Sequence, residues 1–154
     1  MASSVENSIE SIEVVPTGAP VGAEVLGLDL CKPVSDEVKE KLGKLWGEHM
    51  VLLFRNQDLS DENILATAEV FGGQQIAGSR AFFLKAGYKA GESDRVSKYA
   101  GISLVSNLDQ DGKPAKVTAG VGSLEALWHT DNSYVEVPPT ATLARFQAET
   151  PPLV

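Results

Sequence analysis

Two residues near the end of the sequence have the types and the spacing of a metal-binding pair. His129 and Asp131 are separated by one residue in the stretch ALWHTDNSYVEVPP at 126–139. If this stretch is a strand, side chains two positions apart share a face, so the imidazole and the carboxylate would converge. One neutral and one anionic ligand suit a divalent first-row metal, and two histidines with a carboxylate form the facial ligand set of non-haem iron(II) sites. Taken alone, such a pair is more often a surface hydrogen bond than a metal site, so the surrounding segments must decide.

The remaining candidates for chemistry are few. His49 falls at the end of a predicted helix on its apolar side, which is typical of a partly buried core or capping histidine. Cys31 is the only cysteine, so an intrachain disulfide is excluded. Without a CxxC pair or a cysteine-histidine cluster, the common structural zinc sites are excluded as well.

The composition is that of a single globular domain. The chain has 154 residues, of which 43% are hydrophobic, and a net charge of −8. The acidic balance disfavours a nucleic-acid partner, because phosphate binding needs a basic stripe. The polar start lacks the basic and apolar regions of a signal peptide, and no apolar run reaches 18 residues, so we expect a cytoplasmic protein with no membrane partner.

Several elements must position the His-x-Asp pair. Helix caps and apolar spacing predict a helix over 36–49 and a second helix after Ser60 that ends at Gly72-Gly73. We expect residues 1–10 to be disordered. Apolar runs predict strands at 12–18, 22–30, 50–55 (buried), 102–108 and 140–148.

Residues 74–101 mix glycine, charges and aromatic side chains without a clear period. A loop of this length within a domain is usually functional or mobile. Its basic residues fit an active-site lid and a disordered insertion about equally well; they are Arg80, Lys85, Lys89 and Arg95. The predicted strands accumulate towards the C-terminal end of the sequence, and the last of them would leave an unpaired sheet edge. We therefore expect the chain to be part of a longer protein.

The residues around the pair carry a family resemblance. WHTDNSY, followed by PP and an apolar strand, resembles the proximal metal-binding motif of the taurine dioxygenase family, which includes aryloxyalkanoate dioxygenases. GAEVLGLDLCKPVSDE and HMVLLFRNQDLSDENILATAEVFGG resemble upstream segments of that family, in the same order. The likeness covers about residues 12–150 and is weakest at 74–101.

The resemblance implies a mainly β fold with flanking helices around a double-stranded β-helix, the cupin-like jelly roll. Residues 11–154 would supply the N-terminal half of one dioxygenase domain, with a mobile loop at 74–101. The missing partner of this chain would be the C-terminal half of the domain, which carries the distal histidine and the arginine and threonine that bind 2-oxoglutarate. Whether the protein forms a homo-oligomer stays open.

The resemblance also implies a site and a reaction. His129 and Asp131 match the first two iron(II) ligands, with 2-oxoglutarate and O2 as co-substrates. The reaction would oxidise an unactivated C–H bond of a small organic substrate, with release of succinate and CO2. Asp131 argues against a halogenase, since related halogenases lack the carboxylate. With two ligands of three, the chain alone should bind iron poorly.

The sequence differs from taurine-specific members of the family at two substrate-binding positions, which puts taurine in doubt as the substrate. Taurine-specific members have a histidine after the Phe-Gly of the second helix, whereas residues 73–77 contain none, and Glu125 replaces a substrate-contacting asparagine. Glu125 could favour a cationic substrate or be a solvated loop carboxylate, and Asn132 could line the pocket. Two other classes stay open: a catalytically inactive jelly-roll binding module, and a hydrolase that uses His129 and Asp131 without iron.

Overall fold

The computed structural model describes residues 7–76, 78–92, 95–105, 130–132 and 135–146. The chain divides into two compact units, one made of residues 1–73 with 141–154 and the other of residues 74–140. The first unit is therefore discontinuous in sequence, because its last segment follows the whole of the second unit.

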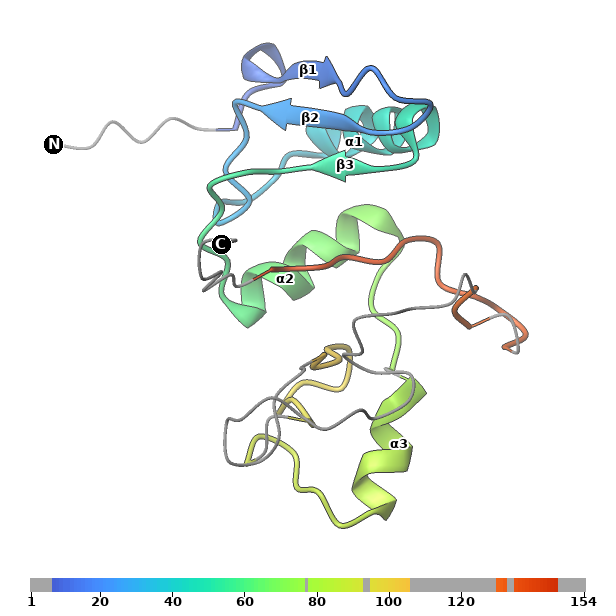
Figure 1. Cartoon of the computed structure of the whole chain (residues 1–154). Helices are drawn as coiled ribbons and strands as arrows, with labels where there is room; N and C mark the ends of the chain where they lie inside the picture. The colour runs from blue at the N-terminus through green and yellow to red at the C-terminus, as the bar shows by residue number, and fades with distance from the viewer. Residues whose placement is uncertain (1–6, 77, 93–94, 106–129, 133–134, 147–154) are drawn as a thin grey trace, which may run out of the picture. The chain divides into compact units, whose positions relative to one another are not determined.

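The first unit is built on a small sheet (Figure 1). Strand β1 (Glu13–Pro16) pairs antiparallel with β2 (Ala23–Leu26), and β3 (Leu52–Leu53) pairs parallel with β2, which gives the order β1-β2-β3. The strands predicted at 12–18 and 22–30 are confirmed. Gly27 ends β2 with φ 77°, and a Cβ there would lie 1.8 Å from the Ser11 carbonyl oxygen. Only glycine fits this close approach.

Helix α1 (Asp36–His49) confirms the prediction for 36–49. The Ser35 side chain accepts a hydrogen bond from the Val38 amide, which caps the first turn. At the other end Met50 takes a left-handed φ of 63° and its amide donates to the Trp46 carbonyl at 2.8 Å. The His49 side chain is 17% exposed in the last turn, in agreement with a partly buried histidine at a helix end.

The core of this unit lies between α1 and one face of the sheet. Val38 and Leu42 are fully buried against Val25 and Ile12. Burial of these apolar groups is what holds the helix on the sheet. The cluster of buried side chains consists of Ile12, Val25, Leu28, Leu30, Val38 and Leu42.

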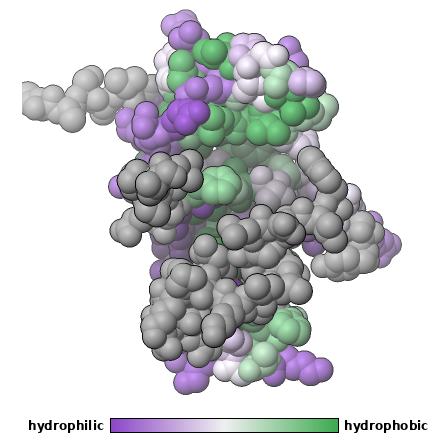
Figure 2. Space-filling view, in the orientation of Figure 1, coloured by the Kyte–Doolittle hydropathy of each residue, from purple (hydrophilic) through white to green (hydrophobic). Residues whose placement is uncertain are grey.

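The other face of the sheet is largely exposed in the part of the chain that the structure describes. Val15, Leu26, Val51 and Leu53 are exposed, and green apolar surface lies among purple polar surface over this unit in the space-filling view (Figure 2). The prediction of a buried strand at 50–55 is therefore wrong in its burial, since Leu53 is 40% exposed, although β3 forms within it. A continuous apolar run predicts cover on both faces, and among the described residues α1 covers only one.

Helix α2 (Asp61–Ala68) begins where the sequence predicts. Ser60 and Asn63 form a capping box, each side chain bonding the other's backbone amide. A 3-10 turn, η2 (Glu69–Phe71), continues the helix to Gly72, which takes φ 105°. The predicted second helix and its glycine end are confirmed.

Side-chain amides fasten the loop that follows β2. Gln57 accepts from the Leu30 amide at 2.8 Å and donates to the Leu28 and Arg55 carbonyls at 3.0 and 3.1 Å. Asn7, just before the 3-10 turn η1 (Ile9–Ser11), bonds both the amide and the carbonyl of Asp29. The prediction of disorder at residues 1–10 is therefore wrong for residues 7–10, which are structured, while residues 1–6 lie outside the described residues.

The second unit contains a helix that the sequence analysis did not predict. Helix α3 (Gly78–Lys85) lies within the predicted loop at 74–101. The strand predicted at 102–108 is reduced, over residues 102–105, to an isolated bridge between Val96 and Ser103. The strand predicted at 140–148 is wrong over 141–146, where no ladder is formed among the described residues.

Among the helices formed by the described residues, none has the length and apolar character needed to cross a membrane.

Candidate functional site

The predicted metal-binding pair lies partly within the described residues. His129 and Glu125 lie outside them, whereas Asp131 and Asn132 form a turn. Asn132 has a left-handed φ of 56°, and its carbonyl accepts from the Val135 amide at 3.2 Å. Asparagine tolerates this conformation better than most residues because its short side chain can bond locally.

The described end of the pair lies in a turn at Asp131 and Asn132, not in a strand. The convergence predicted for His129 and Asp131 stays a prediction, because His129 lies outside the described residues. Asp131 is exposed, so its carboxylate is at the surface of the described part of the unit. A carboxylate on a turn can still serve as one metal ligand, since ligand geometry depends on where the oxygen lies and not on the backbone class.

A side chain from far away in sequence contacts the chain after this turn. The Gln75 amide donates to the Val137 carbonyl at 3.3 Å across 62 positions. Gln75 belongs to the 73–77 stretch, where the sequence analysis looked for a substrate-binding histidine. The structure therefore brings this stretch next to the segment that follows Asp131, within one unit.

Helix α3 is tied to the bridge region of the same unit. Arg80 donates to the Ser97 and Tyr99 carbonyls at 2.7 and 3.3 Å, and the Ser79 and Ser103 hydroxyls lie 3.2 Å apart. These bonds fix one side of α3. Phe82 and Leu84 of the same helix are exposed, and Figure 2 shows green apolar surface over this part of the unit.

The described residues do not by themselves make a metal site. No group of three or more His, Cys, Asp or Glu side chains that could hold a metal occurs among residues 7–76, 78–92, 95–105, 130–132 and 135–146. This agrees with a ligand set of which only Asp131 is described. An exposed carboxylate next to an imidazole in sequence has the donor chemistry that iron(II) accepts.

Cys31 is not an activated nucleophile. Its thiol donates to the Asp58 carbonyl at 3.2 Å. Desolvation and the neighbouring Asp29 carboxylate raise the pKa of the thiol, so the thiolate that nucleophilic attack requires is disfavoured. A hydrolase that uses this residue finds no support.

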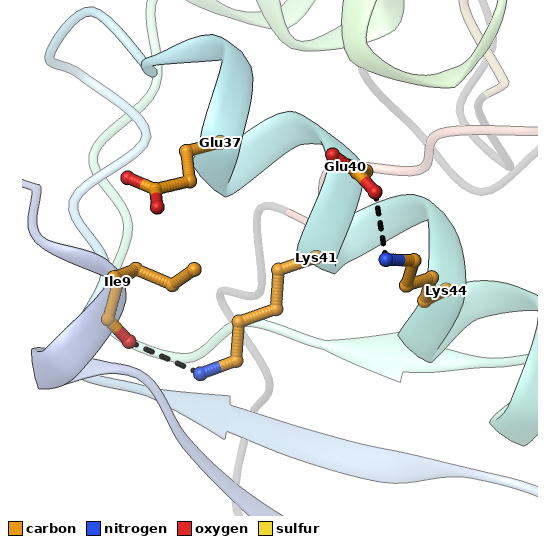
Figure 3. Close-up of a pocket in the computed structure, with 5 residues that line it drawn as sticks. All are labelled: Ile9, Glu37, Glu40, Lys41 and Lys44. Atoms are coloured by element: carbon orange, nitrogen blue, oxygen red, sulfur yellow. Dashed lines mark hydrogen bonds and ion pairs between the residues drawn. The ribbon is translucent and has the colours of Figure 1, made fainter.

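A polar groove lies beside α1 in the first unit (Figure 3). It measures about 200 Å³. Both of its lysines have partners: Lys41 donates to the Ile9 carbonyl at 3.0 Å, and Lys44 pairs with Glu40 at 2.7 Å. None of the predicted site residues lines it. The groove is lined by Ile9, Glu37, Glu40, Lys41 and Lys44.

Two residues that fasten distant segments were not predicted from the sequence. Gln75 was noted only as a non-histidine. Arg145, whose guanidinium donates to the Leu59 carbonyl and to Asp61 Oδ1 within the first unit, was not singled out. Arg145 is the one charged residue in the apolar stretch TATLARFQA, and this isolation was the signal that could have marked it.

Comparison with known proteins gives one family match. Residues 13–150 match the taurine catabolism dioxygenase TauD, TfdA family. The match includes the whole of the WHTDNSY motif.

Individual proteins are similar to this chain over part of their length. Pentalenolactone F synthase of Streptomyces avermitilis is 32% identical over 120 residues, which are 76% of this chain and 34% of the relative. The alpha-ketoglutarate-dependent 2,4-dichlorophenoxyacetate dioxygenase of Cupriavidus pinatubonensis is 30% identical over 128 residues, 80% of this chain and 41% of the relative. A crystal structure of a taurine dioxygenase from Burkholderia xenovorans aligns with a TM-score of 0.41 and 30% identity over 43% of this chain and 24% of that one. The chain thus spans less than half the length of these relatives.

Proposed function

Because the chain belongs to the taurine catabolism dioxygenase TauD, TfdA family, we propose that it forms part of an iron(II)- and 2-oxoglutarate-dependent dioxygenase. The observation that carries the proposal is the family match across residues 13–150, which contains the His-x-Asp motif. The chain would contribute to a jelly-roll domain whose remaining strands come from outside these residues. The reaction oxidises a C–H bond of a small organic substrate and releases succinate and CO2.

His129 and Asp131 would hold the iron, together with a histidine from outside this chain. When bound, iron(II) supplies the oxidising chemistry with 2-oxoglutarate and O2. The single negative charge of Asp131 offsets part of the metal charge, so a dianionic co-substrate can still bind. The Asp131 carboxylate is exposed, so such a role would not require the desolvation of a buried ion.

We further propose a substrate other than taurine. Residues 73–77 lack the histidine found in taurine-specific members, and the Gln75 amide is engaged by the Val137 carbonyl. Glu125 and Asn132 remain proposed substrate contacts, with Glu125 favouring a cationic group.

The test uses the full-length protein with iron(II), ascorbate and 2-oxoglutarate. Succinate release should be lost in His129→Ala and in Asp131→Asn. Glu136→Gln is the matched control, because Glu136 is an exposed carboxylate five positions after Asp131 and is not a proposed ligand. Turnover that survives in Asp131→Asn would contradict the ligand assignment. An active site that neither binds iron(II) nor forms succinate in the unmodified protein would favour the inactive binding module instead.

A further inference from the structure

The last described segment of the first unit, residues 141–146, is extended but unpaired among the described residues. No ladder forms there, and no backbone hydrogen bond joins the segment to another described residue. We propose that in the full-length protein this segment is an edge strand that pairs, backbone to backbone, with a strand from outside residues 1–154. The inference rests on the proposed function, because it assumes the longer dioxygenase domain, and it names the segment of this chain that receives the rest of that domain.

Exposure alternates along the segment as it does along a strand. Residues 141–144 alternate between half-buried and exposed. The pattern continues at the next two positions, since the Arg145 side chain is 28% exposed and Phe146 is 89% exposed. Side chains two positions apart share a face in a strand. One row, which ends at Arg145, therefore faces the first unit, and the other row, which ends at Phe146, faces away from it.

Arg145 fixes the orientation of this segment within the first unit. Its guanidinium donates to the Leu59 carbonyl and lies 3.3 Å from Asp61 Oδ1, at the start of α2. Figure 1 draws the segment as an extended red trace that reaches α2, where these contacts place it. A guanidinium that bonds a carbonyl and a carboxylate together has a more defined position than an isolated surface ion pair. The segment is therefore ordered without a partner strand, which lowers the entropy cost of pairing with one.

The segment lacks the features that keep a natural edge strand unpaired. Free edges are usually protected by charged side chains, by proline or by a bulge. Residues 141–146 contain no proline, and their one charged side chain, Arg145, is engaged by α2. The row that faces away consists of Thr142, Ala144 and Phe146, and β-branched and aromatic side chains suit cross-strand pairing. Unpaired backbone groups beside an exposed phenylalanine are a template for the addition of another strand.

The occupant that these observations favour is a strand of the same polypeptide. The chain spans less than half the length of the relatives named above. Under the proposed function, more than half of the domain therefore lies outside residues 1–154. A strand in that part would cover Phe146 and bond the backbone of 141–146 at the same time. A second copy of the chain is the alternative occupant, and the experiments separate the two.

The first experiment is residue-resolved amide hydrogen exchange of the full-length protein. We expect alternate amides of residues 141–146 to exchange at least about tenfold more slowly than in an unstructured peptide of the same sequence, because one edge of the strand meets the partner. Thr142→Pro and Leu143→Pro remove amides that point to opposite edges, and Thr142→Ala and Leu143→Ala are their matched controls. At least one proline variant should remove the protection of the remaining amides, while its alanine control retains it. Unprotected amides in the unmodified protein, or protection that survives both proline changes, overturn the proposal.

The second experiment identifies the partner strand. Phe146→p-benzoylphenylalanine places a photoreactive ring at the outward position of the segment, and the crosslinked peptides are sequenced. We expect a crosslink to a peptide beyond Val154 of the same polypeptide. The absence of a crosslink, a crosslink to residues 1–154, or a crosslink between two polypeptides overturns the proposal, and the last of these identifies a second copy as the occupant.

Succinate formation by the same full-length protein separates this inference from the proposed function. Protected amides without succinate formation contradict only the proposed function. Succinate formation with unprotected amides at 141–146 overturns only the pairing of this segment.

Discussion

Replacement of Gln57 by alanine tests whether a single amide holds the loop after β2. The Gln57 side chain is half-buried and makes three hydrogen bonds, at 2.8, 3.0 and 3.1 Å, to the Leu30 amide and the Leu28 and Arg55 carbonyls. Leu28 and Leu30 are core residues that are 6% and 4% exposed. Loss of the amide therefore leaves backbone groups next to the core without their partner.

A net contribution of about 1 kcal/mol for each bond predicts that Gln57→Ala lowers the free energy of unfolding by about 2–3 kcal/mol. Gln57→Glu separates the contribution of the side chain as a hydrogen-bond donor from its contribution as an acceptor. It keeps an oxygen for the Leu30 amide but directs a second oxygen at two carbonyls, so the pKa of this glutamate should lie above its usual value. Because its folded-state pKa is raised, Gln57→Glu should regain stability relative to the unmodified protein as the pH falls through that pKa.

The assay is urea unfolding of the full-length protein at pH 7 and at pH 4.5, with constant m values as the test for an unchanged unfolding transition. Gln75→Ala serves as the control for glutamine removal, since its single 3.3 Å bond is exposed and should contribute less than about 0.5 kcal/mol. Equal losses for Gln57→Ala and Gln75→Ala would refute the reasoning, because water would then replace the three bonds at no cost.

Three further predictions concern the first unit. Gly27→Ala should lower the free energy of unfolding by about 2–4 kcal/mol, measured by urea unfolding, because its Cβ would meet the Ser11 carbonyl at 1.8 Å at a left-handed φ. Leu42→Ala should lower it by about 3–4 kcal/mol, since Leu42 is 0% exposed and leaves a cavity in the core. Lysine partners hold the pKa of Asp36 and Glu40 below the usual values. Their contribution to α1 is therefore present above the ordinary carboxyl pKa of about 4 and lost as the pH falls through the lowered values, which far-UV circular dichroism at low and high salt would detect.

Local signals predicted the helices of the first unit well. Ser35 and Ser60 precede acidic first turns, and both act as caps in the structure. A serine followed by helical apolar spacing predicts where a helix begins without knowledge of its partners. The left-handed Gly72 likewise marks where the second helix ends.

Elements that depend on distant contacts were harder to predict. Helix α3 begins with a glycine and has a weak apolar pattern, and it is held by bonds from Arg80 to carbonyls 17 and 19 positions away. The exposed side of β3 depends on which faces of the sheet are covered, which a strand's own sequence does not encode.

The candidate site shows the same division. The types and spacing of His129 and Asp131 could be identified from the sequence, and the family match includes both residues. The turn at Asp131 could not be predicted, because it depends on a left-handed Asn132, which an alternating pattern does not reveal. The attachments by Gln75 and Arg145 span 62 and at least 84 positions, beyond the reach of any local pattern.

The discontinuous first unit has a consequence for synthesis of the chain on the ribosome. Residues 1–73 emerge first, but the segment that Arg145 fastens to α2 is translated after the entire second unit. At about 5–20 residues per second, the 73 residues between positions 73 and 146 take about 4–15 s. During that interval the start of α2 lacks its contacts with Arg145, so a nascent chain is exposed to chaperones and to self-association for seconds. Slower translation of residues 74–146 should therefore raise chaperone dependence without any change in the folded protein.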